Sequence, residues 1–281
     1  MHIAEWIQLI FVTVLAVTSW FFSLGRSRQI RVTALALIAV AAIALSQWLW
    51  RRLAPTASSS IVQDWLPVLL MLIPYWQIGE FFRGADATTQ ERLAAFDRRL
   101  FRWLGIQPSG ISFGAGITTY FQLAYILVYP MIPLGLGALY FVGMRGAVDF
   151  YWVVVLLSIN ISFVITLFVS ALPPRLLPDA ERFILPRTIL GVFNRVILNR
   201  AGIQAITFPS AHVASAMAAA LVLLRVETWI GAIFLWIALS IAMATVVCGY
   251  HYAADVLLAM AIAILVFGLT SRFFAGFAAV Q

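Results

Sequence analysis

The sequence contains no lysine and one cysteine, and only 10% of its 281 residues are charged. Soluble globular domains have about 25% charged residues, so this composition excludes a soluble globular enzyme and a disordered chain. The single cysteine, Cys248, cannot form an internal disulfide, and it excludes a zinc site built from several cysteines.

Hydrophobic residues make up 63% of the chain, and they lie in long charge-free runs. A transmembrane helix needs about 20 such residues, whereas the strands of a membrane β-barrel show short segments of alternating hydrophobicity. The sequence therefore predicts an all-α polytopic membrane protein. The net charge of +7 comes from arginines that flank the runs, so we expect no binding to nucleic acid.

Eight runs are predicted to span the membrane, six of them in a catalytic core. They are Trp6–Gly25, Val32–Trp50, Ile61–Phe81, Ile117–Val142, Phe150–Leu172, Pro209–Val226, Trp229–Gly249 and Tyr252–Phe274. The polar linker Pro55–Ser60 is predicted to separate an N-terminal pair of helices, residues 1–60, from the six-helix core, residues 61–281.

Two further segments predict amphipathic helices that lie in the membrane interface, at Ala87–Leu104 and at about Thr188–Arg200. In the first, apolar side chains recur at helical spacing on one face. The polar face is predicted to contain Glu91, Arg92, Asp97, Arg98, Arg99 and Arg102.

If the eight spans alternate in direction, His212 and His251 lie at the same face of the membrane. His251 precedes Asp255 by four residues in HYAADV, which places both on one side of a helix. A carboxylate bonded to one imidazole nitrogen fixes the tautomer and leaves the other nitrogen free as a nucleophile or base. The alternative is a His–Asp pair that only satisfies its own hydrogen bonds, but ionisable groups within membranes are expensive and usually functional.

His212 follows Ser210 in TFPSAH, a pattern typical of a helix start with proline in its first turn. Free backbone N–H groups at a helix start can bind an anion such as phosphate, although the same segment also fits an ordinary capped helix. Arg175 and Arg195, in the loop before it, are candidate phosphate ligands together with Ser210, since arginine binds phosphate with two parallel hydrogen bonds. Arg182, Arg187 and Arg200 are further candidates that spacing alone cannot rank.

Together these residues describe phosphoryl transfer through a phosphohistidine. His251, oriented by Asp255, attacks phosphorus, and His212 protonates the leaving alkoxide and then activates water or an acceptor hydroxyl. The arginines, Ser210 and backbone N–H groups hold the charge on the phosphoryl oxygens. This chemistry requires neither a metal nor a cofactor.

FPSAH and YHYAADV resemble the second and third motifs of the phosphatidic acid phosphatase type 2 superfamily, whose usual forms are PSGH and SR-x5-H-x3-D. The resemblance implies a core of six membrane helices and a substrate lipid with a phosphate ester. It also implies His212 as general acid, His251 as nucleophile, Asp255 as its partner and Ser210 in the phosphate site.

The chain departs from these motifs at three places. Ala244 and Thr245 occupy the positions of the third-motif serine and arginine, and the first motif, K-x6-RP, is absent. Instead, the PPR segment Pro173–Arg175 resembles an APP-containing segment of the inositol-phosphorylceramide synthase branch. That branch also has a threonine before an H-Y-x-x-D segment, which is similar to Thr245 followed by His251, Tyr252 and Asp255. That branch transfers a phosphorylated headgroup, such as inositol phosphate, between lipids.

Three alternatives stay open. With water as the acceptor, the protein is a simple lipid-phosphate phosphatase. Intramembrane charges and proline-broken helices also occur in a lipid transporter or flippase, which would show repeats that this sequence lacks, and a non-catalytic superfamily member would function without His251. Most arginines lie on the side of the two histidines, which favours a cytoplasmic site, whereas the resemblance implies the outer or lumenal face for many members.

Overall fold

The computed structural model describes residues 2–52, 57–177, 183, 185–203 and 207–274. The described chain is helical and contains no strand. The helices are α1 (Ile3–Phe21), α2 (Arg26–Arg52), α3 (Ala57–Leu70), α4 (Leu72–Glu80), α5 (Ala87–Trp103), α6 (Ala115–Ile126), α7 (Val128–Phe141), α8 (Val148–Thr166), α9 (Ile189–Ala201), α10 (Ala211–Val226), α11 (Thr228–Val247) and α12 (Ala253–Ser271), with 3-10 turns at Pro108–Gly110, Arg145–Ala147 and Pro174–Leu176.

The protein is an integral membrane protein with several spans. Among the described residues, six segments are long and apolar enough to cross a membrane, and the pair α6–α7 gives a seventh if it forms one span. Helix α10 has only 16 residues, about 24 Å at 1.5 Å per residue, so it is shorter than the ~30 Å hydrocarbon core. Each of the eight predicted spans coincides with one or two helices, but α10 is shorter than the length that a span needs.

The segment predicted as one span, Ile117–Val142, is bent, because α6 and α7 meet at 60° around Leu127. Whether the pair forms one span stays a prediction. Pro130 follows three residues after Leu127. A proline has no N–H to bond the carbonyl four residues before it, and its ring clashes with that carbonyl. Likewise, Pro74 follows three residues after Met71, the residue between α3 and α4.

Other predicted boundaries also shift. The arginines before the second span, which were expected to flank it, form the first turns of α2. Part of the predicted linker Pro55–Ser60 lies outside the described residues, and α3 already begins at Ala57. Helix α8 ends at Thr166, so the following segment up to Leu172 is not helical.

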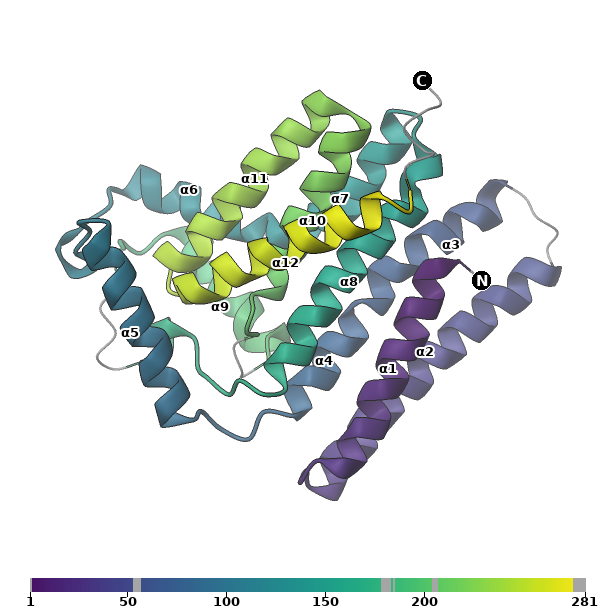
Figure 1. Cartoon of the computed structure of the whole chain (residues 1–281), viewed down its shortest axis with the longest axis horizontal. Coiled ribbons are helices and arrows are strands. Elements are labelled where there is room, and N and C mark those ends of the chain that lie inside the picture. The colour runs from purple at the N-terminus through teal and green to yellow at the C-terminus, as the bar shows by residue number, and fades with distance from the viewer. Residues whose placement is uncertain (1, 53–56, 178–182, 184, 204–206, 275–281) are drawn as a thin grey trace.

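Helix α10 is packed between α8, α11 and α12 (Figure 1). Small side chains let neighbouring membrane helices approach closely, and five of its alanines are fully buried: Ala214, Ala216, Ala218, Ala219 and Ala220. The start of α10, which contains His212, is therefore held by helices on several sides.

The N-terminal hairpin of α1 and α2 is joined to α4 by polar contacts as well as by packing. The Gln77 amide of α4 is buried, and it donates to the carbonyls of Val12 at 3.2 Å and Val32 at 2.9 Å. Arg31 forms two hydrogen bonds of 2.8 Å with the carboxylate of Glu80, the last residue of α4.

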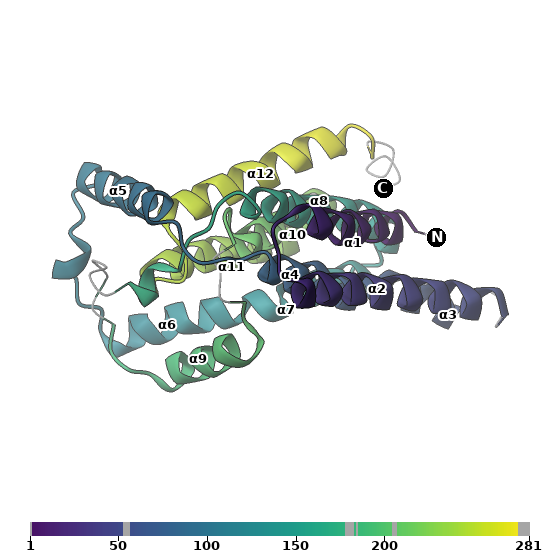
Figure 2. The same ribbon diagram turned by 90° about the horizontal axis from the view of Figure 1, so that it is seen from below.

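Helices α5 and α9 confirm the two helices predicted outside the spans. Figure 2 shows α9 beside α6, and α5 beside the start of α12, at the end of the bundle opposite to the start of α1. The assignment of Asp97 to the polar outer face of α5 is wrong, because its side chain is buried against α12 and accepts a hydrogen bond from Ala253 N–H.

Candidate active site

His251 lies in a tight turn between α11 and α12. The Thr245 carbonyl accepts hydrogen bonds from the backbone N–H of Tyr250 at 2.8 Å and of His251 at 3.0 Å. Gly249 has a φ of 69°, a conformation that glycine adopts at little cost. The Thr245 hydroxyl donates to the Ala242 carbonyl and its side chain is fully buried. Thr245 therefore shapes the turn and does not reach a ligand.

The structure brings His251 and Asp255 together, with 3.0 Å between Nδ1 and Oδ2. His251 does not lie on α12, as the spacing suggested, but two residues before its start. The Asp255 carboxylate reaches back from the first turn of α12 and also accepts from Tyr252 N–H at 3.2 Å. Since Asp255 Oδ2 acts as an acceptor, Nδ1 of His251 is the donor and Nε2 is the nitrogen with a free lone pair.

His212 lies in the first turn of α10 and faces His251. The two imidazole rings are perpendicular to within 8°, with an interplanar angle of 82° and 6.3 Å between their centroids. The Nδ1 atom of His212 is buried and has no hydrogen-bond partner among the described residues. A phosphoryl group between the rings can contact both histidines.

Ser210 lies behind the cavity wall. Its side chain is fully buried, and Oγ accepts from Val213 N–H at 3.4 Å as the N-cap of α10. Its own N–H donates to the Asp255 carbonyl at 3.3 Å, which joins the start of α10 to the start of α12. Ser210 therefore supports the starts of both helices, and Thr207, three residues before it, lines the cavity instead.

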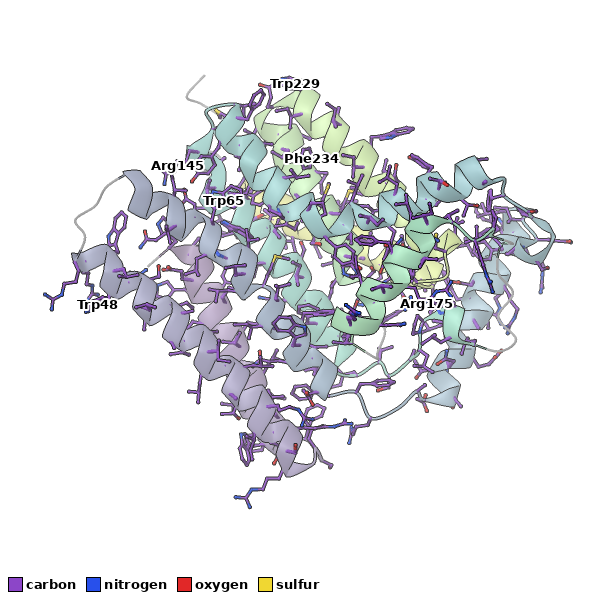
Figure 3. All side chains as sticks on the ribbon, turned by 180° about the vertical axis from the view of Figure 1, so that it is seen from behind. Trp48, Trp65, Arg145, Arg175, Trp229 and Phe234 are labelled. Carbon is purple, nitrogen blue, oxygen red and sulfur yellow. The ribbon has the colours of Figure 1, made fainter. Side chains whose placement is uncertain are left out.

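Arg175 lies beside the turn that contains His251. Its N–H donates to the Gly249 carbonyl at 2.9 Å, and its guanidinium lies 4.8 Å from the centre of the Tyr250 ring. Tyr250 in turn stacks on Tyr125 at 3.8 Å between ring centroids. Figure 3 shows Arg175 and Arg145 at opposite ends of the bundle. The cation–π contact holds the Arg175 charge beside Tyr250, the residue that precedes His251.

A cavity of about 950 Å³ opens over these residues. Both histidines line it, as do Arg175, Arg187 and Arg195, and none of the described lining residues is acidic. Arg195 projects from α9, which forms one wall. Arg200 does not line the cavity, and Arg182 lies outside the described residues.

Sequence reasoning missed a buried network that connects α9 to the histidine turn. The Gln122 side-chain oxygen on α6 accepts from Asn194 of α9 at 2.6 Å and from the Tyr250 hydroxyl at 3.0 Å. The only sequence signal for this network is that its polar residues are isolated within apolar runs. Nothing in the sequence indicates which of these residues contact one another.

The comparisons with known proteins decide the family. The family model of the PAP2 superfamily matches residues 91–269, more than half of the chain. The chain belongs to the PAP2 superfamily. Neither the search of curated proteins nor the search of solved structures gives a match.

The PAP2 match extends from within α5 to the end region of α12, and it includes both histidines, Asp255 and Arg175. Members of the PAP2 superfamily are phosphatases, which supports an enzyme that acts on lipid phosphate esters. Helices α1 to α4 precede the match.

The electrostatics of the turn favour a neutral His251. Burial, and after it the positive charge of Arg175, lower the pKa of His251 from its ordinary 6.5 to about 3. A neutral imidazole is the nucleophilic form.

Proposed function

We propose that this protein is a lipid phosphotransferase or phosphatase that works through a phosphohistidine intermediate. One observation carries the proposal. The structure places His212 and His251, from different helical segments, with 6.3 Å between ring centroids at a cavity that also contains Arg175. Membership in a family of phosphatases supports an enzyme over a lipid transporter.

In the first step, Nε2 of His251 forms a bond to phosphorus while the bond from phosphorus to the ester oxygen breaks. Asp255 holds Nδ1 at 3.0 Å and stabilises the charge that develops on the imidazole. His212 donates a proton to the leaving alkoxide. In the second step, His212 removes a proton from water or from a lipid hydroxyl, whose oxygen then displaces His251 from phosphorus. Arg175, with Arg187 and Arg195 in the same cavity, neutralises the phosphoryl oxygens.

The acceptor distinguishes two versions of this reaction. The PPR segment Pro173–Arg175, which resembles the headgroup-transferring branch, supplies an arginine whose N–H bonds the Gly249 carbonyl and whose guanidinium lies over the Tyr250 ring. This favours transfer of a phosphorylated headgroup to a lipid hydroxyl. With water as the acceptor, the same residues release inorganic phosphate from a simple lipid phosphate.

The purified full chain, assayed with and without a metal chelator, tests both versions. One arm measures inorganic phosphate released from phosphatidic acid, lysophosphatidic acid and an isoprenyl phosphate. The other supplies phosphatidylinositol as donor with ceramide as acceptor, and measures the ceramide that has gained the inositol phosphate headgroup. Activity in either arm supports the proposal and identifies the acceptor. No activity in both arms contradicts it, and activity that the chelator abolishes contradicts the metal-independent mechanism.

The lowered pKa of His251 predicts the acid side of the pH profile. A histidine with a lowered pKa keeps its neutral, nucleophilic form as the pH falls below 6.5, the ordinary value. The acid limb of kcat/KM is therefore expected well below pH 6.5. An acid limb at or above pH 6.5 would contradict a buried, neutral nucleophile beside Arg175.

A further inference from the structure

Helix α5 contacts both halves of the candidate site through two side chains, Gln90 and Asp97. Figure 2 shows α5 beside the start of α12. The two residues lie seven positions apart, two helical turns, so they project from the same face of α5. That face meets the turn of His251 and the segment that leads to Arg175.

Gln90 bridges these two segments with one amide. Its Nε2 donates to the Tyr252 hydroxyl at 2.8 Å and to the Leu172 carbonyl at 3.2 Å. Its Oε1 accepts from Leu172 N–H at 3.1 Å. Tyr252 directly follows His251, and Leu172 lies three residues before Arg175. The Gln90 amide therefore fixes the distance between the turn that contains His251 and the segment from Leu172 to Arg175.

Asp97 holds the start of α12. Its Oδ1 accepts from Ala253 N–H at 2.9 Å, and Ala253 is the first residue of that helix. The first N–H groups of a helix have no partner within the helix, and a negative charge is favourable there. Asp255 lies two residues further on and bonds His251. Asp97 thus sets the direction from which Asp255 reaches the imidazole.

Packing reinforces these bonds. Tyr252 is fully buried in a cluster with Leu93 of α5 and Ala171. The Arg175 N–H also bonds the Gly249 carbonyl directly. The turn that contains His251 is therefore held both by the segment that leads to Arg175 and by α5.

We propose that Gln90 and Asp97 are positioning residues that aim Nε2 of His251 at the phosphorus held by Arg175. The inference rests on the proposed function. Neither side chain lines the cavity, so neither contacts the substrate. Their loss is expected to weaken binding of the transition state much more than binding of phosphate, because only the transition state needs the nucleophile aligned with phosphorus.

Inorganic vanadate and inorganic phosphate test this without knowledge of the lipid. Vanadate becomes five-coordinate by bonding a nucleophilic side chain, as phosphorus does in the transition state, whereas phosphate stays tetrahedral. The affinity of both ions is measured on the purified full chain for Asp97→Ala and Gln90→Met. Asp97→Asn keeps an oxygen that accepts from Ala253 N–H. Glu91→Gln is the matched control, since Glu91 lies on the same helix and pairs with Arg98 on its exposed face.

We expect Asp97→Ala and Gln90→Met to weaken vanadate binding about tenfold and phosphate binding less than about twofold, the effect of one or two lost hydrogen bonds. Asp97→Asn is expected to recover vanadate affinity to within about threefold, because it retains the acceptor. Glu91→Gln is expected to match the wild type.

The remaining results separate this inference from the function on which it rests. If vanadate binds the wild type and is lost in His251→Ala, but both α5 variants bind it normally, the positioning role is wrong and the function stands. Equal loss of vanadate and phosphate in both variants also overturns the positioning role, since it indicates general damage to the site. Vanadate binding that is absent, or that His251→Ala leaves unchanged, overturns the proposed function and this inference with it.

Discussion

His251→Ala is expected to reduce phosphoryl transfer at least about 1,000-fold while the protein keeps its fold, because a nucleophile of covalent catalysis has no substitute in the site. Nε2 of His251 has a free lone pair at the cavity, and Asp255 holds the opposite nitrogen at 3.0 Å. His212 contacts neither Asp255 nor another carboxylate among the described residues, so it cannot replace the oriented imidazole. The initial rate with the best donor–acceptor pair measures the loss.

His2→Ala is the matched control. His2 precedes α1 at the far end of the bundle, where it contacts Asp149 and Gln63. Its removal is expected to leave the rate within about twofold of the wild type, as for a surface substitution away from the site. A His251→Ala protein that keeps a tenth or more of the wild-type rate would exclude His251 as the nucleophile and would favour a non-catalytic role or a transporter.

Arg175→Ala is expected to lower kcat/KM about 100-fold or more, which is typical for the loss of one preorganised group that stabilises transition-state charge. The usual third-motif arginine is replaced by Thr245, which is fully buried and bonds its own helix. Arg175 lies over the ring of Tyr250, and Tyr250 is the residue that precedes His251. The structure therefore favours Arg175 as the cation that serves the reacting phosphoryl group.

Arg175→Lys and Arg195→Ala make this prediction specific. Lysine keeps the charge but not the two parallel donors, so partial recovery is expected, within about tenfold of the wild type. Arg195 lines the cavity from α9 with an exposed side chain, so its loss is expected to raise KM about fivefold with little change in kcat, as for uniform binding. A larger effect from Arg195→Ala than from Arg175→Ala would assign the principal phosphate ligand to α9.

The sequence predicted those features that depend on local patterns. Apolar run length located the spans, and the alternation of their directions placed both histidines at one end of the bundle, as the structure confirms. The pairing of His251 with Asp255 followed from a spacing of four residues. It forms even though His251 lies outside the helix, because the Asp255 carboxylate turns back over the start of α12.

Features that depend on long-range contacts could not be predicted in this way. Asp97 lies among arginines, a typical pattern for a solvated face, and only the tertiary fold shows that it meets Ala253 N–H. The bend at Leu127 had a local cause in Pro130, yet a proline alone does not distinguish a kinked span from a broken one. The division into residues 1–60 and 61–281 stays a prediction.

Capture of the covalent intermediate tests the central claim most directly. The full chain is mixed for milliseconds to seconds with phosphatidic acid labelled with ³²P, or with phosphatidylinositol labelled on its phosphate, and then denatured at alkaline pH. A phosphorus–nitrogen bond survives alkali and breaks in acid. The account predicts an alkali-stable, acid-labile label on the peptide that contains His251, and no label in His251→Ala. Turnover of either lipid with no labelled protein, or with label on another residue, would contradict it.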